Sequence, residues 1–413
     1  MVKLLIMADD FTGALDTGVQ FAGRGAETVV VTNLNFVFKT LDPKVEVLVM
    51  VTETRHLSAT EAYDIVYGVV KRALDAGIST IYKKTDSALR GNIGSELKAL
   101  MDAAKVRNLP FIPAFPVLQR VTRKGIHYIE GIPVAESVFG KDPFEPILDS
   151  SVEKIIRHQT EVPVVIQGRE NSYDMKDPGI QVFDAETDAD LQEIGKGLGL
   201  ERLRFSAGCA GFASTLADLL GINGPTHQGE KLEENLFIAC GSVNPVTIRQ
   251  LKAAREGGFP HIQLTPEQKL EGSWLEKDAS NEEIKRWIQM ASGMKRFILD
   301  VNDPEGADDT EQYKVAHGLT TENLRESISE NFAAIMKRML DGGLRATVIC
   351  TGGDTLMALM QILGIYELTP IYELAPGVVA TKFTYNGRTY NMISKSGGIG
   401  NEDLLLKIAD MIC

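Results

Sequence analysis

The 413-residue sequence has few cysteines and no long apolar run. Its four cysteines, at positions 209, 240, 350 and 413, are far apart and form no Cys-x-x-Cys pair, which argues against a zinc site or a disulfide framework. No stretch of about 18 uncharged apolar residues is present, which excludes a membrane-spanning helix. The apolar segment at the N-terminus is too short for a signal peptide. We therefore expect a cytoplasmic protein with free thiols.

The chain also has fewer positively charged than negatively charged side chains. The chain has 43 Lys and Arg against 56 Asp and Glu, a formal net charge of −13 at pH 7. The resulting negative field disfavours non-specific binding to nucleic acid or to an anionic membrane, although it leaves room for a local cationic pocket. We therefore expect small-molecule ligands. A homodimer is compatible with the sequence, which does not determine the oligomeric state.

Several common catalytic motifs are missing. The sequence contains no Gly-x-x-x-x-Gly-Lys-[Ser/Thr], so it is not a P-loop enzyme, and no Gly-x-Gly-x-x-Gly, so a dinucleotide-binding fold is unsupported. A Gly-x-Ser-x-Gly nucleophile motif is absent as well. The six histidines show no metal-ligand spacing, so they identify no metal site, and the residues that would hold a metal stay unknown. His127 lies in a segment of interest, and we favour a structural role for it.

What the sequence does contain is a regular alternation of short apolar strands and longer amphipathic helices. Such alternation predicts βαβ units whose parallel strands are buried on both faces. We therefore predict an α/β protein with two α/β domains, each with a mainly parallel sheet flanked by helices. The predicted strands include residues 3–8, 27–32, 46–52, 80–83, 110–114, 236–240, 296–301 and 346–350.

Two interruptions of this pattern organise the chain. Residues 221–235 are rich in Gly and polar residues without apolar periodicity, which is typical of a linker. We place the domains at 1–225 and 226–413. Residues 115–150 form a proline-rich insertion of a kind that is more often functional than ornamental, and they include a predicted hairpin at 122–129. A second hairpin, 378–394, is predicted from the Asn-Gly pair at 386–387.

Charged residues cluster where predicted strands end, the edge at which parallel sheets bind ligands. Asp9 and Asp10 follow the first strand and would hold hydroxyls, accept a proton or ligate a metal. A helix N-cap is the alternative, although a third acid at Asp16 favours function. Arg55 follows the 46–52 strand and is compatible with either a carboxylate clamp or a surface ion pair. The densest cluster, suited to a polyhydroxylated anion, comprises Lys83, Lys84, Thr85, Asp86, Ser87, Arg90 and Asn92.

Glycine is in excess, at 38 residues, and several glycines follow predicted strands of the second domain. Such turns let the backbone approach a ligand, and a following helix N-terminus offers N–H groups to phosphate. One turn of this kind is usually structural, whereas three in one domain indicate a nucleotide or phosphate site. The three are 241–242, 352–355 and 396–400.

With these motifs the sequence resembles the four-carbon acid sugar kinase family, whose members include D-threonate, D-erythronate and 3-oxotetronate 4-kinases. The matching stretches are ADDFTGALD (8–16), KKTDSALRGN (83–92), CGSVNPVT (240–247), TGGDT (351–355) and KSGGIG (395–400). They follow the family order from one end of the chain to the other. Mild departures are Ala88, Asp354 and Ile399.

The resemblance implies an N-terminal domain that binds the acid sugar and a C-terminal domain that binds ATP, with the active site in the inter-domain cleft. Arg55, Lys84 and Arg90 are candidates for holding the sugar carboxylate, and Mg²⁺ would bridge the ATP phosphates. An acid among Asp9, Asp10 and Asp86 would act as the catalytic group that orients or deprotonates the attacking hydroxyl. The expected substrate contacts are Asp9, Asp10, Arg55, Lys84, Thr85, Asp86, Ser87 and Arg90, and the expected ATP contacts are Ser242, Gly352, Gly353, Asp354, Thr355 and Gly398.

The sequence thus favours ATP-dependent phosphorylation of the terminal hydroxyl of a four-carbon sugar acid. Two alternatives stay open. One is a non-catalytic sensor that binds sugar acid and nucleotide without consuming ATP. The other is an oxidoreductase or aldolase of sugar-acid metabolism, which would need a redox cofactor or a Schiff-base lysine.

Overall fold

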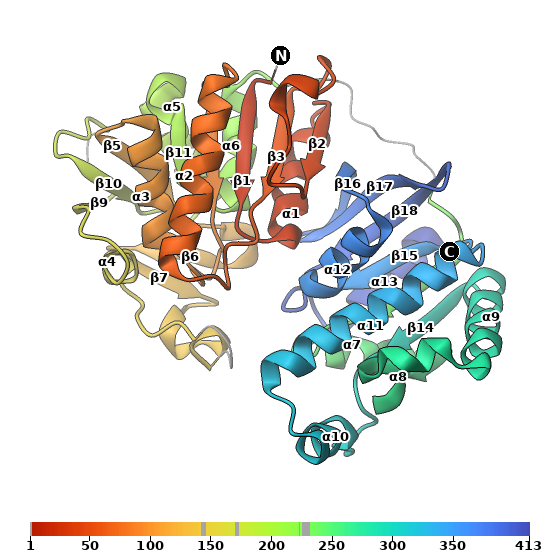
Figure 1. Ribbon diagram of the computed structural model, residues 1–413. Coiled ribbons are helices and arrows are strands. Elements are labelled where there is room, and N and C mark those ends of the chain that lie inside the picture. Colours follow the sequence, from red (N-terminus) through yellow and green to blue (C-terminus); the bar gives the residue numbers. More distant parts are fainter. Residues whose placement is uncertain (1, 142–145, 170–172, 223, 225–231) are drawn as a thin grey trace. The chain divides into compact units, whose positions relative to one another are not determined.

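The structure is a computed structural model, and it describes the chain except for residues 1, 142–145, 170–172, 223 and 225–231 (Figure 1). The chain divides into two compact units, Met1–Gln228 and Gly229–Cys413. The predicted domain boundary at 225/226 and part of the predicted linker lie outside the described residues. Among the described helices, none is long and apolar enough to cross a membrane. Cys209, Cys240, Cys350 and Cys413 are free thiols, as predicted.

The N-terminal unit contains a parallel sheet with helices on both faces. Its strands are β1 (Leu4–Ala8), β2 (Thr28–Val31), β3 (Val47–Val51), β4 (Ile81–Lys84), β5 (Asn108–Ile112), β9 (Val164–Gln167), β10 (Gly179–Phe183) and β11 (Phe205–Gly208). Their order is β2-β3-β1-β4-β11-β5-β10-β9, and every neighbouring pair is parallel. β1 and β3 are fully apolar and buried because helices cover both faces of the sheet.

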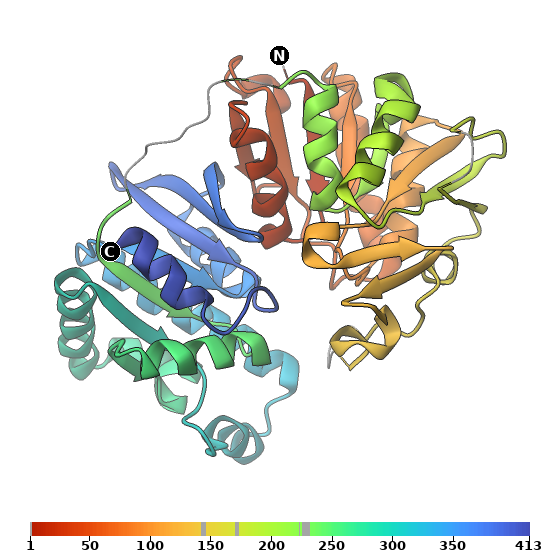
Figure 2. The same cartoon turned by 180° about the vertical axis from the view of Figure 1, so that it is seen from behind.

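The helices of this unit lie in two layers. They are α1 (Phe11–Ala22), α2 (Ala59–Asp75), α3 (Ile93–Ala104), α4 (Val152–Arg157), α5 (Asp188–Leu203) and α6 (Ala210–Leu219). α2 and α3 pack together on one face, and α1, α5 and α6 cover the other (Figures 1 and 2). α2 begins at Ser58, whose side chain and Glu61 form a capping box. One core joins the α2–α3 layer to the sheet.

The C-terminal unit has a mixed sheet. Its strands are β12 (Leu236–Cys240), β13 (His261–Gln263), β14 (Arg296–Asp300), β15 (Thr347–Thr351), β16 (Glu367–Ala375), β17 (Val378–Tyr385) and β18 (Arg388–Lys395). The order β13-β14-β12-β15-β18 is parallel, and β17 and β16 add antiparallel strands. The predicted hairpin is confirmed: β17 and β18 pair around Asn386 and Gly387, which have φ values of 48° and 74°.

Helices cover both faces of this sheet too. They are α7 (Pro245–Glu256), α8 (Pro266–Leu270), α9 (Asp278–Gly293), α10 (Asp309–His317), α11 (Thr321–Asp341), α12 (Gly353–Leu363) and α13 (Leu404–Ile412). α7 and α13 pack on one face, whereas α11 packs with α8, α9 and α12 on the other (Figure 2). The prediction of an α/β protein with mainly parallel strands is therefore confirmed.

The insertion at 115–150 contains the predicted hairpin. β6 (Arg120–Arg123) and β7 (Ile126–Ile129) pair antiparallel, and β8 (Ile132–Pro133) extends them into a small separate sheet. The turn residues Lys124 and Gly125 have φ values of 50° and 71°. Through a bridge from Thr122 to Ala185, the hairpin is attached to the end of β10. Backbone pairing thus holds residues 120–133 of the insertion together.

His127 connects this hairpin to the segment that follows β4. Its ring is fully buried, with Nε2 2.9 Å from the carbonyl oxygen of Ser87 and Nδ1 3.0 Å from Thr122 Oγ1. Because a carbonyl can only accept, Nε2 carries the proton and Nδ1 accepts from the threonine hydroxyl. Burial lowers the pKa of His127 from 6.5 to about 4, so the ring is neutral at pH 7. This is the structural role that we expected.

The close approach of α3 to α4 gives a first prediction. A Cβ added at Gly94 would lie 2.2 Å from the carbonyl oxygen of Ile156, so the two backbones would have to separate. We expect Gly94→Ala to lower the free energy of unfolding by about 1–3 kcal/mol in urea titrations. The matched control is Gly68→Ala in α2, where nothing lies within 4 Å; it should raise stability by about 0.4–1 kcal/mol. If the two substitutions changed the free energy of unfolding equally, the close packing of Gly94 against Ile156 would not explain the loss.

His127 gives a second prediction. In the unfolded chain the ring takes up its second proton near pH 6.5, but in the folded protein only near pH 4. Stability contributed by the neutral ring is therefore present above pH 6.5 and is lost as the pH falls, by up to about 3 kcal/mol. The difference in urea midpoint between the wild type and His127→Gln should narrow between pH 7 and pH 4.5. A difference that stays constant would show that the ring does not titrate in this way.

Candidate active site

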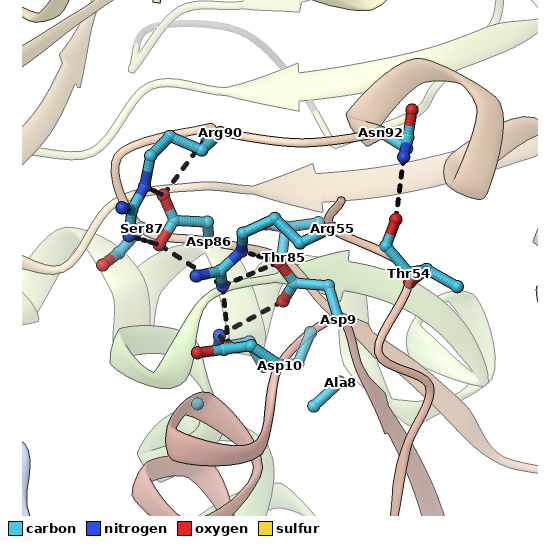
Figure 3. Close-up of polar contacts among 12 residues, drawn as sticks. Ala8, Asp9, Asp10, Thr54, Arg55, Thr85, Asp86, Ser87, Arg90 and Asn92 are labelled. Atoms are coloured by element: carbon cyan, nitrogen blue, oxygen red, sulfur yellow. Dashed lines mark hydrogen bonds and ion pairs between the residues drawn. The ribbon is translucent and has the colours of Figure 1, made fainter. Parts of the chain in front are cut away.

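Three neighbouring strands of the N-terminal sheet bring the first set of predicted residues together. β3, β1 and β4 are adjacent and parallel, and Ala8 is in register with both Val51 and Lys84. Their carboxyl ends therefore lie side by side, and the residues that follow them converge (Figure 3). The figure shows the side chains of Asp9, Asp10, Arg55, Asp86 and Arg90 directed toward one another.

Arg55 lies at the centre of this cluster. Its Nη2 is 2.7 Å from both Asp9 Oδ2 and Asp10 Oδ1, and its Nε donates to Asp9 at 2.8 Å. The same Nη2 lies 3.6 Å from Asp86 Oδ1. Burial would lower the pKa of Arg55, but the three carboxylates outweigh it and hold the pKa well above its ordinary value. Arg55 is thus not the surface ion pair that the sequence left open.

Lys84 reaches the same two acids from the end of β4. Its Nζ is 3.5 Å from Asp9 Oδ1 and 3.3 Å from Asp10 Oδ1. Burial would raise the pKa of Asp9, but Arg55 and Lys84 outweigh it and lower the pKa to about 2. A Cβ at Gly13 would lie 2.0 Å from the Lys84 ammonium nitrogen, so only glycine leaves space for this contact.

Asp10 occupies the N-cap position of α1 but makes no capping hydrogen bond. Its carboxylate turns toward Arg55 and Lys84 instead, so the alternative of a simple helix cap does not describe it. The Asp10 side chain is 23% exposed, compared with 2% for Asp9 and 8% for Asp86. Of the three predicted catalytic acids, Asp10 is therefore the one most accessible to a ligand.

Asp86 and Arg90 form a two-point ion pair after β4. Arg90 Nε lies 2.8 Å from Asp86 Oδ2, and Arg90 Nη2 lies 3.2 Å from Oδ1. Burial would raise the pKa of Asp86, but Arg90 and Arg55 hold it well below its ordinary value. The backbone between Asp86 and Arg90 is strained, because Leu89, which is buried, has a positive φ of 68°.

The remaining predicted residues of this cluster have different surroundings. Thr85 is fully buried, and its backbone N–H and hydroxyl both donate to the carbonyl of Gly208, away from the acids. Ser87 Oγ accepts a hydrogen bond from Arg120. The amide of Asn92 donates to the carbonyls of Thr54 and Leu57 at 2.8 Å, which holds the Thr54–Leu57 segment in place.

Sequence reasoning missed two charged residues here. Glu96, on α3, forms a fully buried ion pair with Lys83 at 3.0 Å and accepts from Thr54; burial raises the pKa of Glu96 despite the opposing lysine. A single acid in an amphipathic helix gives no signal of such a contact. Arg120 comes from β6, and the available signal was its place inside an insertion already interpreted as functional.

The second predicted set converges in the C-terminal unit. β12, β15 and β18 are adjacent and parallel, with Thr351 in register with both Cys240 and Lys395. The glycine-rich turns 241–242, 352–355 and 396–400 therefore follow neighbouring strand ends. α12 begins directly after Gly352, whose φ is 101°. This arrangement brings together Ser242, Gly352, Gly353, Asp354, Thr355 and Gly398.

Close approaches of glycine fix these turns against each other. A Cβ at Gly241 would lie 2.0 Å from the hydroxyl oxygen of Thr355, and one at Gly397 would lie 2.5 Å from Ser242 Oγ. Thr247 Oγ1 donates to the Gly397 carbonyl at 2.8 Å. The glycines therefore let the turns pack closely beside the N-termini of α7 and α12.

Lys395 is a charged residue of this set that sequence reasoning missed, although it begins one of the quoted motifs. Its side chain is fully buried, and Nζ lies 3.3 Å from Thr247 Oγ1 and 3.0 Å from the Ser396 carbonyl oxygen. No carboxylate of the described residues forms an ion pair with it. Burial lowers the pKa of Lys395 to about 8. A buried ammonium group without an anion stands beside the glycine-rich turns.

The described residues contain no group of three or more His, Cys, Asp or Glu side chains that could hold a metal ion. Mg²⁺ usually takes most of its ligands from substrate phosphates and water, with one or two protein carboxylates. Asp354, in the first turn of α12, has a side chain 46% exposed and lies 3.7 Å from Arg325. It fits the single carboxylate that such an ion needs.

The chain matches two family models over most of its length. The sugar-binding N-terminal domain matches residues 4–216, and the nucleotide-binding C-terminal domain matches residues 237–405. The first contains the acid and cation cluster around Arg55, and the second contains the glycine-rich turns and Lys395. Each set of converging residues thus lies in one of the two domains.

Curated relatives match the chain from end to end. It is 26% identical to a D-threonate kinase of Salmonella typhimurium (100% of both chains), 27% to a D-erythronate kinase of Heliobacterium modesticaldum (100% and 97%), and 25% to a 3-oxo-tetronate kinase of Methylobacterium radiotolerans (98% of both). Solved structures of a Salmonella typhimurium protein and a Haemophilus influenzae protein, each 21% identical, share the fold with TM-scores of 0.79 and 0.72. They cover 100% and 99% of this chain and the full length of their own chains.

With both domain models matched, the chain belongs to the four-carbon acid sugar kinase family.

Proposed function

We propose that this protein is an ATP-dependent kinase that phosphorylates the terminal 4-hydroxyl of a four-carbon sugar acid such as D-threonate, D-erythronate or 3-oxotetronate. The observation that carries the proposal is the cluster of acids and cations around Arg55 in the sugar-binding domain. A short polyhydroxylated acid needs acceptors for its hydroxyls and donors for its carboxylate within a few ångströms, and this cluster contains both.

Asp10 is the acid that we propose to orient the attacking hydroxyl and to take its proton. Asp9, with a pKa of about 2, stays ionised and holds Arg55 and Lys84, while Asp86 holds Arg90. In phosphoryl transfer the protein acts mainly by positioning reactants and stabilising charge. Asp9 and Asp86 would thus organise the cluster, and the more exposed Asp10 would contact the substrate.

On the nucleotide side, we propose that Lys395 and the N-terminus of α12 bind the ATP phosphates. A phosphate placed at the turns 241–242, 352–355 and 396–400 would give the buried ammonium group the anion that it lacks. Mg²⁺ would arrive with ATP, held by phosphates and Asp354, and when bound it supplies positive charge at the transferring phosphate. Ser242 and Gly398 would contact the nucleotide close by.

Direct transfer requires the attacking oxygen and the γ-phosphorus to come within about 3–3.5 Å of each other. Because the two proposed sites belong to different domains, we propose that catalysis takes place in a cleft between them. Bringing the domains together on both substrates would also exclude water, which limits the hydrolysis of ATP.

An ADP-release assay tests the reaction. With ATP and Mg²⁺, at least one acid among D-threonate, D-erythronate and 3-oxotetronate should stimulate ADP release. Asp10→Asn should lower kcat by about 10²–10⁴-fold, because it removes the proton acceptor and one carboxylate facing Arg55. The control Asp64→Asn, on the exposed face of α2, should have no effect. ADP release that does not depend on any acid, or binding without ADP release, would contradict a kinase.

Lys395 gives a separate prediction. Lys395→Met should raise KM for ATP by about 10- to 100-fold while leaving KM for the acid sugar unchanged. In the wild type, kcat/KM for ATP should fall as the pH rises through about 8, because the ammonium loses its proton, and the variant should lack this inflection. Lys407→Met, whose side chain is 59% exposed on α13, is the control. The same inflection in Lys395→Met would exclude this role.

A further inference from the structure

Arg120 lies beside the cluster of acids and cations around Arg55 but differs from the cations of that cluster. Arg55 and Lys84 are bound by Asp9 and Asp10, and Arg90 is bound at two points by Asp86. Arg120 is 8% exposed, and no carboxylate of the described residues forms an ion pair with it. It is therefore a buried guanidinium without a counter-charge.

The surroundings of Arg120 hold it in a fixed orientation. Its Nη1 donates to Ser87 Oγ, and its guanidinium carbon lies 5.2 Å from the ring centroid of Phe139. Arg90 lies 5.1 Å from the same ring, so one aromatic side chain supports both cations. Of the five N–H donors on Arg120, only one has a protein acceptor among the described residues, which leaves a fork of donors for a ligand.

The charges around Arg120 indicate the kind of ligand. Arg55, Lys84 and Arg90 are matched by the carboxylates of Asp9, Asp10 and Asp86, and Lys83 is matched by Glu96. Burial lowers the pKa of Arg120 and outweighs Asp86 and Asp16, which favour its charged form. An anion bound directly to the guanidinium would offset this cost of burial.

We propose that Arg120 binds the carboxylate of the substrate and determines the preference for sugar acids over neutral polyols, an inference that rests on the proposed function. Arg55, Lys84 and Arg90 are less suited to this task. Each would have to leave a buried carboxylate unpaired in order to bind another, which is strongly unfavourable. Arg120 can bind the substrate carboxylate without breaking an ion pair, and its planar guanidinium matches the geometry of a carboxylate.

Selectivity is the readout that separates this role from a structural one. D-threitol and erythritol have the hydroxyls of the four-carbon chain but no carboxylate. We compare kcat/KM for D-threonate and D-erythronate with that for the two polyols in the wild type, Arg120→Gln and Arg123→Gln. Arg123 is the matched control on the same strand, because its side chain is 56% exposed and pairs with Glu186.

Arg120→Gln should raise KM for the acid, so that the ratio of kcat/KM for the acid to kcat/KM for the polyol falls at least 10-fold. KM for ATP should be unchanged. Arg120→Lys should recover part of the ratio, because it restores the charge without the fork. Arg123→Gln should keep the wild-type ratio. If Arg120→Gln lowers kcat/KM for the acid and for the polyol by the same factor, or changes neither, Arg120 does not bind the carboxylate.

Calorimetric titration of the same compounds without ATP separates this inference from the kinase proposal. A wild type that binds an acid but releases no ADP would contradict the kinase and leave the Arg120 test intact as a difference in affinity between wild type and Arg120→Gln. A wild type that binds no acid would overturn the inference. Thermal unfolding without ligand checks the fold: Arg120→Gln should be as stable as the wild type or more so, because it removes an unpaired buried charge.

Discussion

The N-terminal site depends on one shared guanidinium group. Arg55 contacts carboxylates that follow two different strands, Asp9 and Asp10 after β1 and Asp86 after β4, while Arg55 itself follows β3. The ends of three parallel strands are thereby joined by charge as well as by backbone pairing. Lys84 also contacts Asp9 and Asp10, and Arg90 also contacts Asp86. Removing one of these paired groups would be costly, because it would leave a buried partner charge unpaired.

We propose that the two domains bind anionic ligands by different physical means. The sugar-binding domain uses side-chain charges that are held in place by each other. In the nucleotide-binding domain the proposed binding groups are close-packed glycine turns, helix N-termini and the buried ammonium group of Lys395, which has no carboxylate partner among the described residues. Backbone N–H groups cost no side-chain entropy to orient, which suits a ligand such as a phosphate chain that offers many equivalent oxygens.

Most of the fold and much of the first site could be predicted from the sequence. Continuous apolar runs identified β1 and β3, and parallel pairing brings together whatever follows such strands. β16 was missed because Pro370 interrupts its pattern; the structure accommodates this proline directly before a register shift. Arg120 and Lys395 lie in segments that the sequence singled out, the insertion at 115–150 and the motif at 395–400, but a single cation on a strand gives no sign of burial until the fold shows what surrounds it. The sequence also could not predict that Thr85 points away from the acids, because this depends on its hydrogen bond to Gly208, which is distant in the sequence.

The sharing of Arg55 among three acids also bears on how this site can diverge. A substitution at Asp9, Asp10 or Asp86 changes the electrostatic environment of the same guanidinium, so the effect of each depends on which residues occupy the other positions. With the substrate bound as proposed, variation in substrate preference is easier to acquire at the periphery of the cluster than within it. The insertion that carries β6 and β7 is such a periphery, because it is joined to the central residues by a few hydrogen bonds, including those from Arg120 and His127 to Ser87.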